Sequence, residues 1–112
     1  MNILPRADEA VIPLEKFTKY ALNFDRDKDK AIAFELALGF NLGNVNLLID
    51  SIRLGLRGFP ALKKQDSEFG TKYEVVMDIT GANNKTAKVL TAWIDDVENG
   101  EMRLTSAYVD ER

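Results

Sequence analysis

The spacing of hydrophobic residues along the chain changes near Pro60. Before this proline, apolar residues recur every three or four positions, which is the spacing of one buried helix face. After it, they alternate with polar residues, as in a strand with one buried face. We therefore predict a single α+β domain over residues 1–112, with a helical half at 1–60 and an antiparallel sheet half at 61–112.

Three helices are expected in the first half. The first covers about 13–22, the second follows a charged turn and ends at Gly39, and the third covers about 44–58. Asp27 or Asp29 can cap the second helix, and glycine can adopt the left-handed conformation that ends it. The buried stripes of the three helices are Leu14, Phe17, Ala21 and Leu22; Ala31, Phe34, Ala37 and Leu38; and Val45, Leu48, Ile49, Ile52 and Leu56.

Three long strands and one short strand are expected in the second half. The long strands begin near Thr71, Lys85 and Glu101, and the short strand lies near Ala61–Lys64. The pair Asn99–Gly100 is typical of a tight hairpin turn. Consecutive hairpins predict an antiparallel sheet of three to four strands. The helices pack on one face of this sheet and leave the other face available for a site.

Alternation assigns the strand side chains to these two faces. In the last strand, about 101–109, strict alternation places Tyr108 on the same side as Leu104 and Met102, and therefore in the core with its hydroxyl at the rim. It places Arg103 on the opposite side.

Composition and charge exclude several classes of function. The chain contains no Cys and no His, which removes thiol catalysis, disulfides, Cys-ligated zinc and an imidazole base. A net charge of −3 argues against a general nucleic-acid binder. No apolar run approaches the roughly 20 residues that span a bilayer. We expect a cytoplasmic protein with no metal site, no cofactor and no membrane partner.

Five blocks of the sequence together resemble an uncharacterised bacterial and prophage domain family, whose members look like C-terminal modules of polymorphic toxins. The resemblance covers nearly the whole chain. Its layout of helices followed by a sheet is similar to that of the barnase, EndoU, colicin and RelE group of ribonuclease toxins. The blocks are Ile12-Pro13 with Glu15-Lys16; Lys30-Ala31, Phe34 and Leu38-Gly39-Phe40; Gly70-Thr71-Lys72-Tyr73; Thr80-Gly81, Lys85-Thr86-Ala87, Val89, Thr91 and Trp93; and Arg103-Leu104 with Ala107-Tyr108.

The resemblance implies RNA cleavage on the sheet, without a metal ion, by the matched residues Lys30, Lys72, Arg103 and Tyr108. The accompanying binding candidates are Glu74, Trp93 and Ser106. The chain departs from the family pattern at Ser106, where Thr is frequent, and at Val109, where Pro is frequent.

Cleavage of RNA without His leaves few candidates for each chemical role. The base that deprotonates the 2′-hydroxyl is Glu74, Lys30, Lys72 or Tyr108, and each needs burial and a specific neighbour. Arg103 is suited to the charged phosphorane because its planar fork matches two phosphate oxygens. Each residue also has a structural interpretation: a solvated lysine, a surface ion pair or, for Tyr108 and Trp93, a place in the core.

A second function remains open beside the ribonuclease. Residues 94–112 contain six acidic residues and two arginines, and an acidic surface can dock on a basic patch. The alternative is therefore a non-enzymatic prophage protein that inhibits a host or defence protein. The expected partners are RNA, or a host or immunity protein. The chain acts in its own cytoplasm, or in a target cell if a larger toxin delivers it.

Overall fold

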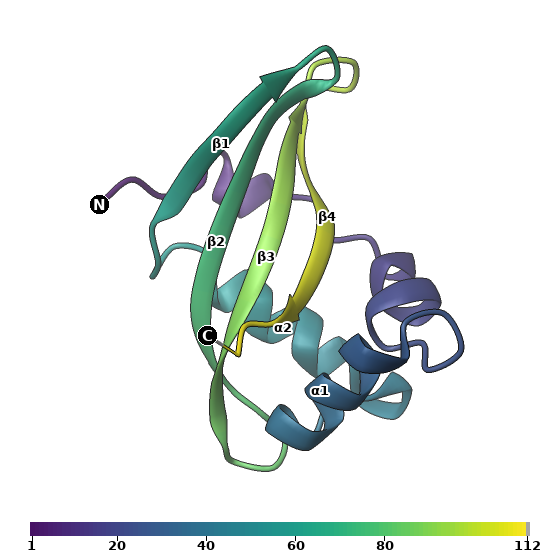
Figure 1. Ribbon diagram of the computed structural model, residues 1–112. Helices are drawn as coiled ribbons and strands as arrows, with labels where there is room; N and C mark the ends of the chain where they lie inside the picture. The colour runs from purple at the N-terminus through teal and green to yellow at the C-terminus, as the bar shows by residue number, and fades with distance from the viewer. Residues whose placement is uncertain (112) are drawn as a thin grey trace.

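The computed structural model describes residues 1–111 as a four-stranded antiparallel sheet with helices on one face (Figure 1). The strand order is β1-β2-β3-β4, so each strand pairs with its neighbour in sequence. The predicted α+β arrangement is confirmed. The elements are η1 (Ala7–Glu9), η2 (Phe17–Ala21), α1 (Lys28–Leu38), η3 (Leu42–Asn44), α2 (Val45–Gly55), β1 (Ala61–Ser67), β2 (Gly70–Thr80), β3 (Thr86–Asp96) and β4 (Glu101–Val109).

Helix α1 begins and ends as its sequence predicts. The Asp27 carboxylate accepts the backbone N–H of Lys30 at 3.3 Å and caps the first turn. At the other end, Gly39 has φ 70°, and the N–H of Phe40 donates to the carbonyl of Phe34 at 3.3 Å. These bonds satisfy backbone groups that a helix end would otherwise leave unpaired.

The helix expected over 13–22 is instead a π-helical turn, η2. The N–H of Leu22 donates to the carbonyl of Phe17 at 2.9 Å, five residues back. The Asn23 side chain ends this turn, because its amide donates to the carbonyl of Thr18 and its oxygen accepts the N–H of Asp25. Buried Phe17 and Ala21 satisfy the apolar spacing in either kind of turn.

The core lies between the helices and one face of the sheet. It is built from α1 and α2, the N-terminal segment, and alternate residues of β2, β3 and β4. Its largest fully buried side chains include Phe17, Phe34, Phe40 and Trp93. At the bottom of the sheet in Figure 1, the β2–β3 turn meets the end of α1 so closely that a Cβ on Gly81 would lie 2.0 Å from the carbonyl oxygen of Leu38.

A β-bulge in β4 overturns the face predicted for Tyr108. The pairing of β3 with β4 shifts between Ala92 and Trp93, which leaves Thr105 unpaired. The extra residue reverses the alternation, so the buried residues change from even to odd numbers along the strand. Ser106 and Tyr108 therefore lie on the same face as Arg103. The β4 residues in the core are Met102, Leu104, Ala107 and Val109.

The N-terminal segment extends the sheet by one parallel bridge. The N–H of Val11 donates to the carbonyl of Met102 at 2.7 Å, and the N–H of Leu104 donates to the carbonyl of Val11 at 2.9 Å. The outer edge of β4 is therefore covered at this point. Strand β1 extends to Ser67, three residues beyond the expected short strand.

Among the described residues, no single helix has the length and apolar character needed to cross a membrane. One pair, Lys28–Leu38 with Leu42–Gly55, passes the same test jointly by length and composition, with a bend of 59° between its members.

Candidate functional site

The sheet face opposite the helices carries most of the predicted site residues. We call it the open face. Strand register arranges it in rows that cross the strands: Lys72, Ile94 and Arg103; Glu74, Ala92 and Ser106; Val76, Leu90 and Tyr108; and Asp78 with Lys88.

Lys30 and Tyr108 meet at the border of the open face. The ammonium of Lys30, in the first turn of α1, lies 5.5 Å from the centre of the Tyr108 ring. Such a cation–π contact holds a positive charge beside the ring. The same ammonium lies 3.6 Å from the carboxylate of Asp27. Both residues line a surface pocket of about 280 Å³ that also includes Asp29 and Glu111.

Lys72 and Glu74 line a second pocket of about 390 Å³, higher on the open face. The Glu74 carboxylate lies 3.8 Å from the ammonium of Lys64 in β1. Lys72 is exposed and has no ion-pair partner among residues 1–111. This part of the open face therefore presents a carboxylate between two lysines.

Arg103 lies among acidic side chains. Its guanidinium donates to Glu101 at 2.8 Å, and this hydrogen bond is the main reason that its pKa is raised above the ordinary value. The charges of Asp96 and Glu15 raise the pKa further. Its Nε is buried without a hydrogen-bond partner in the described residues. A guanidinium in this setting already has carboxylate partners, which compete with any phosphate.

Trp93 lies on the opposite face from the other candidates. Its ring is 1% exposed and belongs to the core. Its indole N–H donates to the hydroxyl of Thr91 at 2.8 Å, and that hydroxyl donates to the carbonyl of Val75 at 2.8 Å. The structural interpretation of Trp93 holds, because its ring is not accessible to a stacking base.

On the open face, four of the predicted residues form two separate groups: Tyr108 with Lys30, and Lys72 with Arg103. Tyr108 pairs with Leu90, whereas Lys72 and Arg103 flank Ile94, four residues further along β3. At about 3.3 Å per residue, this separation is roughly 13 Å. Lys30 contacts Tyr108 and therefore belongs to the first of these groups. Glu74 and Ser106 occupy the row between the two groups, on either side of Ala92.

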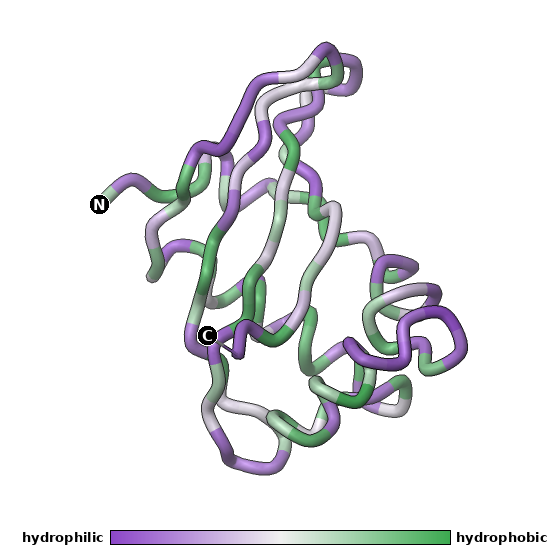
Figure 2. The backbone as a smooth tube through the Cα atoms, in the orientation of Figure 1, coloured by the Kyte–Doolittle hydropathy of each residue, from purple (hydrophilic) through white to green (hydrophobic). Residues whose placement is uncertain are grey.

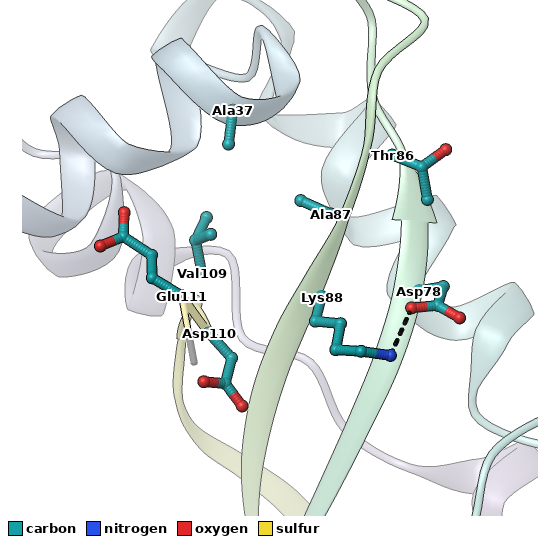
Figure 3. Close-up of a pocket in the computed structure, with 8 residues that line it drawn as sticks. All are labelled: Ala37, Asp78, Thr86, Ala87, Lys88, Val109, Asp110 and Glu111. Atoms are coloured by element: carbon teal, nitrogen blue, oxygen red, sulfur yellow. Dashed lines mark hydrogen bonds and ion pairs between the residues drawn. The ribbon is translucent and has the colours of Figure 1, made fainter.

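A broader pocket, of about 470 Å³, lies where the end of α1 leaves the sheet (Figure 3). Ala37, Ala87 and Val109 form its apolar wall, and the Lys88 ammonium points to Asp78 at 3.0 Å. Its remaining charged side chains, Asp110 and Glu111, are acidic.

The sequence analysis missed an aromatic cluster next to α1. Cations lie over two exposed rings: Arg26 and Lys16 are 4.9 and 5.7 Å from the centre of Tyr20, and Lys28 is 5.5 Å from that of Phe24. The only signal in the sequence was the alternation of Lys, Arg and aromatic residues over 16–28, which the prediction divides between the first helix, about 13–22, and a solvated turn over 25–30.

Comparison with known proteins identifies a family but no characterised relative. A family model described as Domain of unknown function (DUF6883) matches residues 3–111. No curated protein and no solved structure matches the chain.

Proposed function

The chain belongs to the DUF6883 family of unknown function, and from that premise we propose that it is a toxin-like domain that cleaves RNA on the open face of its sheet. One observation carries the proposal. Six of the seven candidate residues lie on that face or at its border, where Lys30 and Tyr108 are in contact.

The bulge at Thr105 strengthens this interpretation. It moves Tyr108 out of the core, where alternation predicted it, and onto the face that carries Lys72 and Glu74. Bulges commonly redirect a side chain beside an active site. A phenol buried in the core has no access to a substrate, whereas the Tyr108 hydroxyl on the open face can reach one.

The proposed reaction is internal transfer of a phosphodiester. The 2′-oxygen of the RNA forms a bond to phosphorus while the bond from phosphorus to the 5′-oxygen breaks, which yields a cyclic phosphate and a free 5′-hydroxyl. Glu74 and Tyr108 lie two strands and two residues apart in the sheet, about 12 Å between backbone positions, so Glu74 accepts the proton of the 2′-hydroxyl through water while Tyr108 donates a proton to the 5′-oxygen. Lys30, beside Tyr108, stabilises the charge that develops on the phosphate.

Lys72 contributes to binding the RNA strand rather than to the reacting phosphate. The separation of about 13 Å between its row and that of Tyr108 exceeds what one phosphate can bridge. We assign Arg103 no contact with the reacting phosphate, because Glu101 already holds its guanidinium at 2.8 Å. The cations over Tyr20 and Phe24 lie near the start of α1, where they alternate along the chain with Asp25, Asp27 and Asp29.

The test is induced expression in a bacterium, followed by incubation of the purified protein with single-stranded RNA. We expect growth arrest in the bacterium. With the purified protein, we expect RNA fragments with cyclic phosphate ends, whose formation does not change when a metal chelator is added. Tyr108→Phe removes only the hydroxyl and keeps the ring, and Lys30→Gln removes the charge. Each should slow cleavage by about 100-fold or more, the usual contribution of a proton-transfer group for Tyr108 and of a charge-stabilising group for Lys30.

Matched controls separate catalysis from surface charge. Tyr20→Phe removes the hydroxyl of another tyrosine with cations over its ring, and Lys88→Gln removes an exposed charge from the same open face. Both variants should cleave RNA like the wild type. An inert wild-type protein, or equal losses in Tyr108→Phe and Tyr20→Phe, would refute the proposal.

A further inference from the structure

We infer that the end of the sheet furthest from α1 is a docking surface for a basic protein. This end, which we call the sheet tip, consists of residues 66–70 and 95–101 and contains the β1–β2 and β3–β4 turns. It extends beyond the helices at the top of Figure 1. The inference does not depend on RNA cleavage.

Two hydrophobic side chains protrude from the sheet tip. Phe69 is 67% exposed and Val97 is 69% exposed. The N–H of Val97 donates to the carbonyl of Phe69 at 3.1 Å, so the two residues lie side by side on adjacent turns. Figure 2 shows the surrounding turns as largely hydrophilic, with short hydrophobic stretches. An exposed aromatic residue within a polar rim is typical of an interaction anchor.

Close packing and hydrogen bonds hold the backbone of the turn that carries Phe69. Gly70 has φ 144°, and a Cβ there would lie 2.0 Å from the carbonyl oxygen of Asp95. The hydroxyl of Ser67 donates to the carbonyl of Gly70 and accepts the N–H of Phe69, which closes the first turn. A turn whose backbone is held in place before binding loses less conformational entropy when a partner covers it.

Charge specifies the partner. The sheet tip contains six acidic residues and no basic residue, the acids being Asp66, Glu68, Asp95, Asp96, Glu98 and Glu101. Arg6 pairs with Asp95, Arg103 pairs with Glu101 and Lys63 pairs with Asp66. Glu68, Asp96 and Glu98 have no ion pair within residues 1–111. The hydrogen bond from the backbone N–H of Glu98 lowers the pKa of Asp96.

An apolar centre with an acidic rim fits one class of occupant. Nucleic acid and anionic lipid surfaces carry negative charge and are repelled. A second copy of the chain would place one acidic tip against another. A protein with an apolar pocket surrounded by Lys and Arg is complementary in both respects. Asp96 lies six residues from Leu90 along β3, about 20 Å from the row of Tyr108, so such a partner leaves that row uncovered.

The absence of cysteine makes the test direct. Val97→Cys, labelled with a photoreactive benzophenone, is irradiated in a lysate of the organism that encodes the chain. Lys85→Cys, labelled in the same way, reports the exposed turn at the opposite end of the sheet. We expect a basic protein to be joined to residue 97 and not to residue 85. The captured protein is then purified and titrated against unlabelled chain.

Two variants and two controls decide the result. Phe69→Ala should weaken binding by about tenfold or more, and Glu98→Lys should weaken it and reduce its dependence on salt. Leu54→Ala removes another exposed hydrophobic side chain, and Asp50→Lys reverses another exposed charge, both on α2. Neither control should change the affinity. Thermal unfolding verifies that each variant is folded. The result is judged on binding affinity alone, whether or not a variant cleaves RNA.

The inference is overturned by any of four results: no capture at residue 97 above that at residue 85, capture of an acidic protein, capture of a second copy of the chain, or equal affinity for wild type and Phe69→Ala. An inactive wild-type chain that still binds a basic protein through Phe69 would refute the proposed RNA cleavage and support the docking surface.

Discussion

Replacing Thr91 with valine isolates the contribution of one buried hydroxyl. Thr91 is fully buried, and its hydroxyl lies 2.8 Å from both the carbonyl of Val75 and the indole nitrogen of Trp93. Valine has nearly the same shape, so Thr91→Val creates almost no cavity. It leaves the Trp93 N–H, already excluded from water, without an acceptor.

The expected cost follows from this geometry. Leaving a buried donor unpaired costs about 1–3 kcal/mol, and the lost bond to Val75 adds about 0.5–1.5 kcal/mol. The additional buried apolar surface of the valine side chain offsets part of this cost. We therefore expect Thr91→Val to lower the free energy of unfolding by about 2 kcal/mol, which corresponds to a fall of roughly 8 °C in Tm for a domain of this size.

Urea unfolding is a convenient assay because Trp93 is the only tryptophan in the chain, so its fluorescence reports the site directly. The urea midpoint should fall by about 1 M with the slope unchanged. Thr105→Val is the matched control, since Thr105 is exposed at the β4 bulge, and it should alter stability by less than about 0.5 kcal/mol.

A double-mutant cycle then assigns the cost to the indole. In a Trp93→Phe background no N–H is left unpaired, so Thr91→Val should cost less than it does in the wild type. Circular dichroism replaces fluorescence for these two proteins. The reasoning is refuted if Thr91→Val is as stable as Thr105→Val, or if its cost is the same with phenylalanine at position 93.

Two further predictions concern close packing and pH. Gly81→Ala places a Cβ against the carbonyl oxygen of Leu38 and should lower the free energy of unfolding by about 3 kcal/mol, whereas Gly58→Ala, with ordinary contacts at 3.5 Å, should not; chemical unfolding of both variants measures the difference. The hydrogen bond from the Glu98 N–H lowers the pKa of folded Asp96, so its charged form contributes stability above the ordinary pKa of about 4, and this contribution is lost as pH falls through the lower folded value. The stability difference between wild type and Asp96→Asn should therefore be constant near neutral pH and shrink below about pH 4; a difference that does not change with pH would contradict this assignment.

Much of the fold follows from local signals in the sequence. Gly39, Asp27 and the alternation from Tyr73 to Ile79 determine where α1 begins and ends and which face of β2 is buried. The strand order follows as well, because short turns between successive strands favour antiparallel neighbours.

The features that the sequence did not reveal depend on long-range contacts. Nothing in the composition of β4 marks Thr105 as unpaired, because the bulge arises from pairing with β3 and the bridge to Val11. One extra residue was enough to place Tyr108 on the wrong face in our prediction. The π-helical form of η2 was also missed, since its apolar spacing suits an α-helix equally well. The prediction ended strand β1 too early, because the polar residues of this strand are mostly exposed and do not alternate with apolar ones.

The candidate site was predicted as a set of residue types and only partly as an arrangement. Lys30 and Tyr108 lie in distant parts of the sequence and meet because α1 packs along β4. The environment of Arg103 was partly expected as a salt bridge. Its acidic neighbours, Glu101, Asp96 and Glu15, come from three separate segments of the chain. The alternation of residues within one strand cannot indicate neighbours from other segments.

The close contact of Gly81 with Leu38 makes α1 a spacer of fixed length. The helix is anchored where it ends, and Lys30 lies eight residues earlier, about 12 Å along the axis. One residue inserted between these points would shift Lys30 by about 1.5 Å and rotate it by roughly 100°, away from Tyr108. The pairing of Lys30 with Tyr108 is therefore a constraint on chain length, and it tolerates substitutions on the outer surface of α1 far better than insertions or deletions within it.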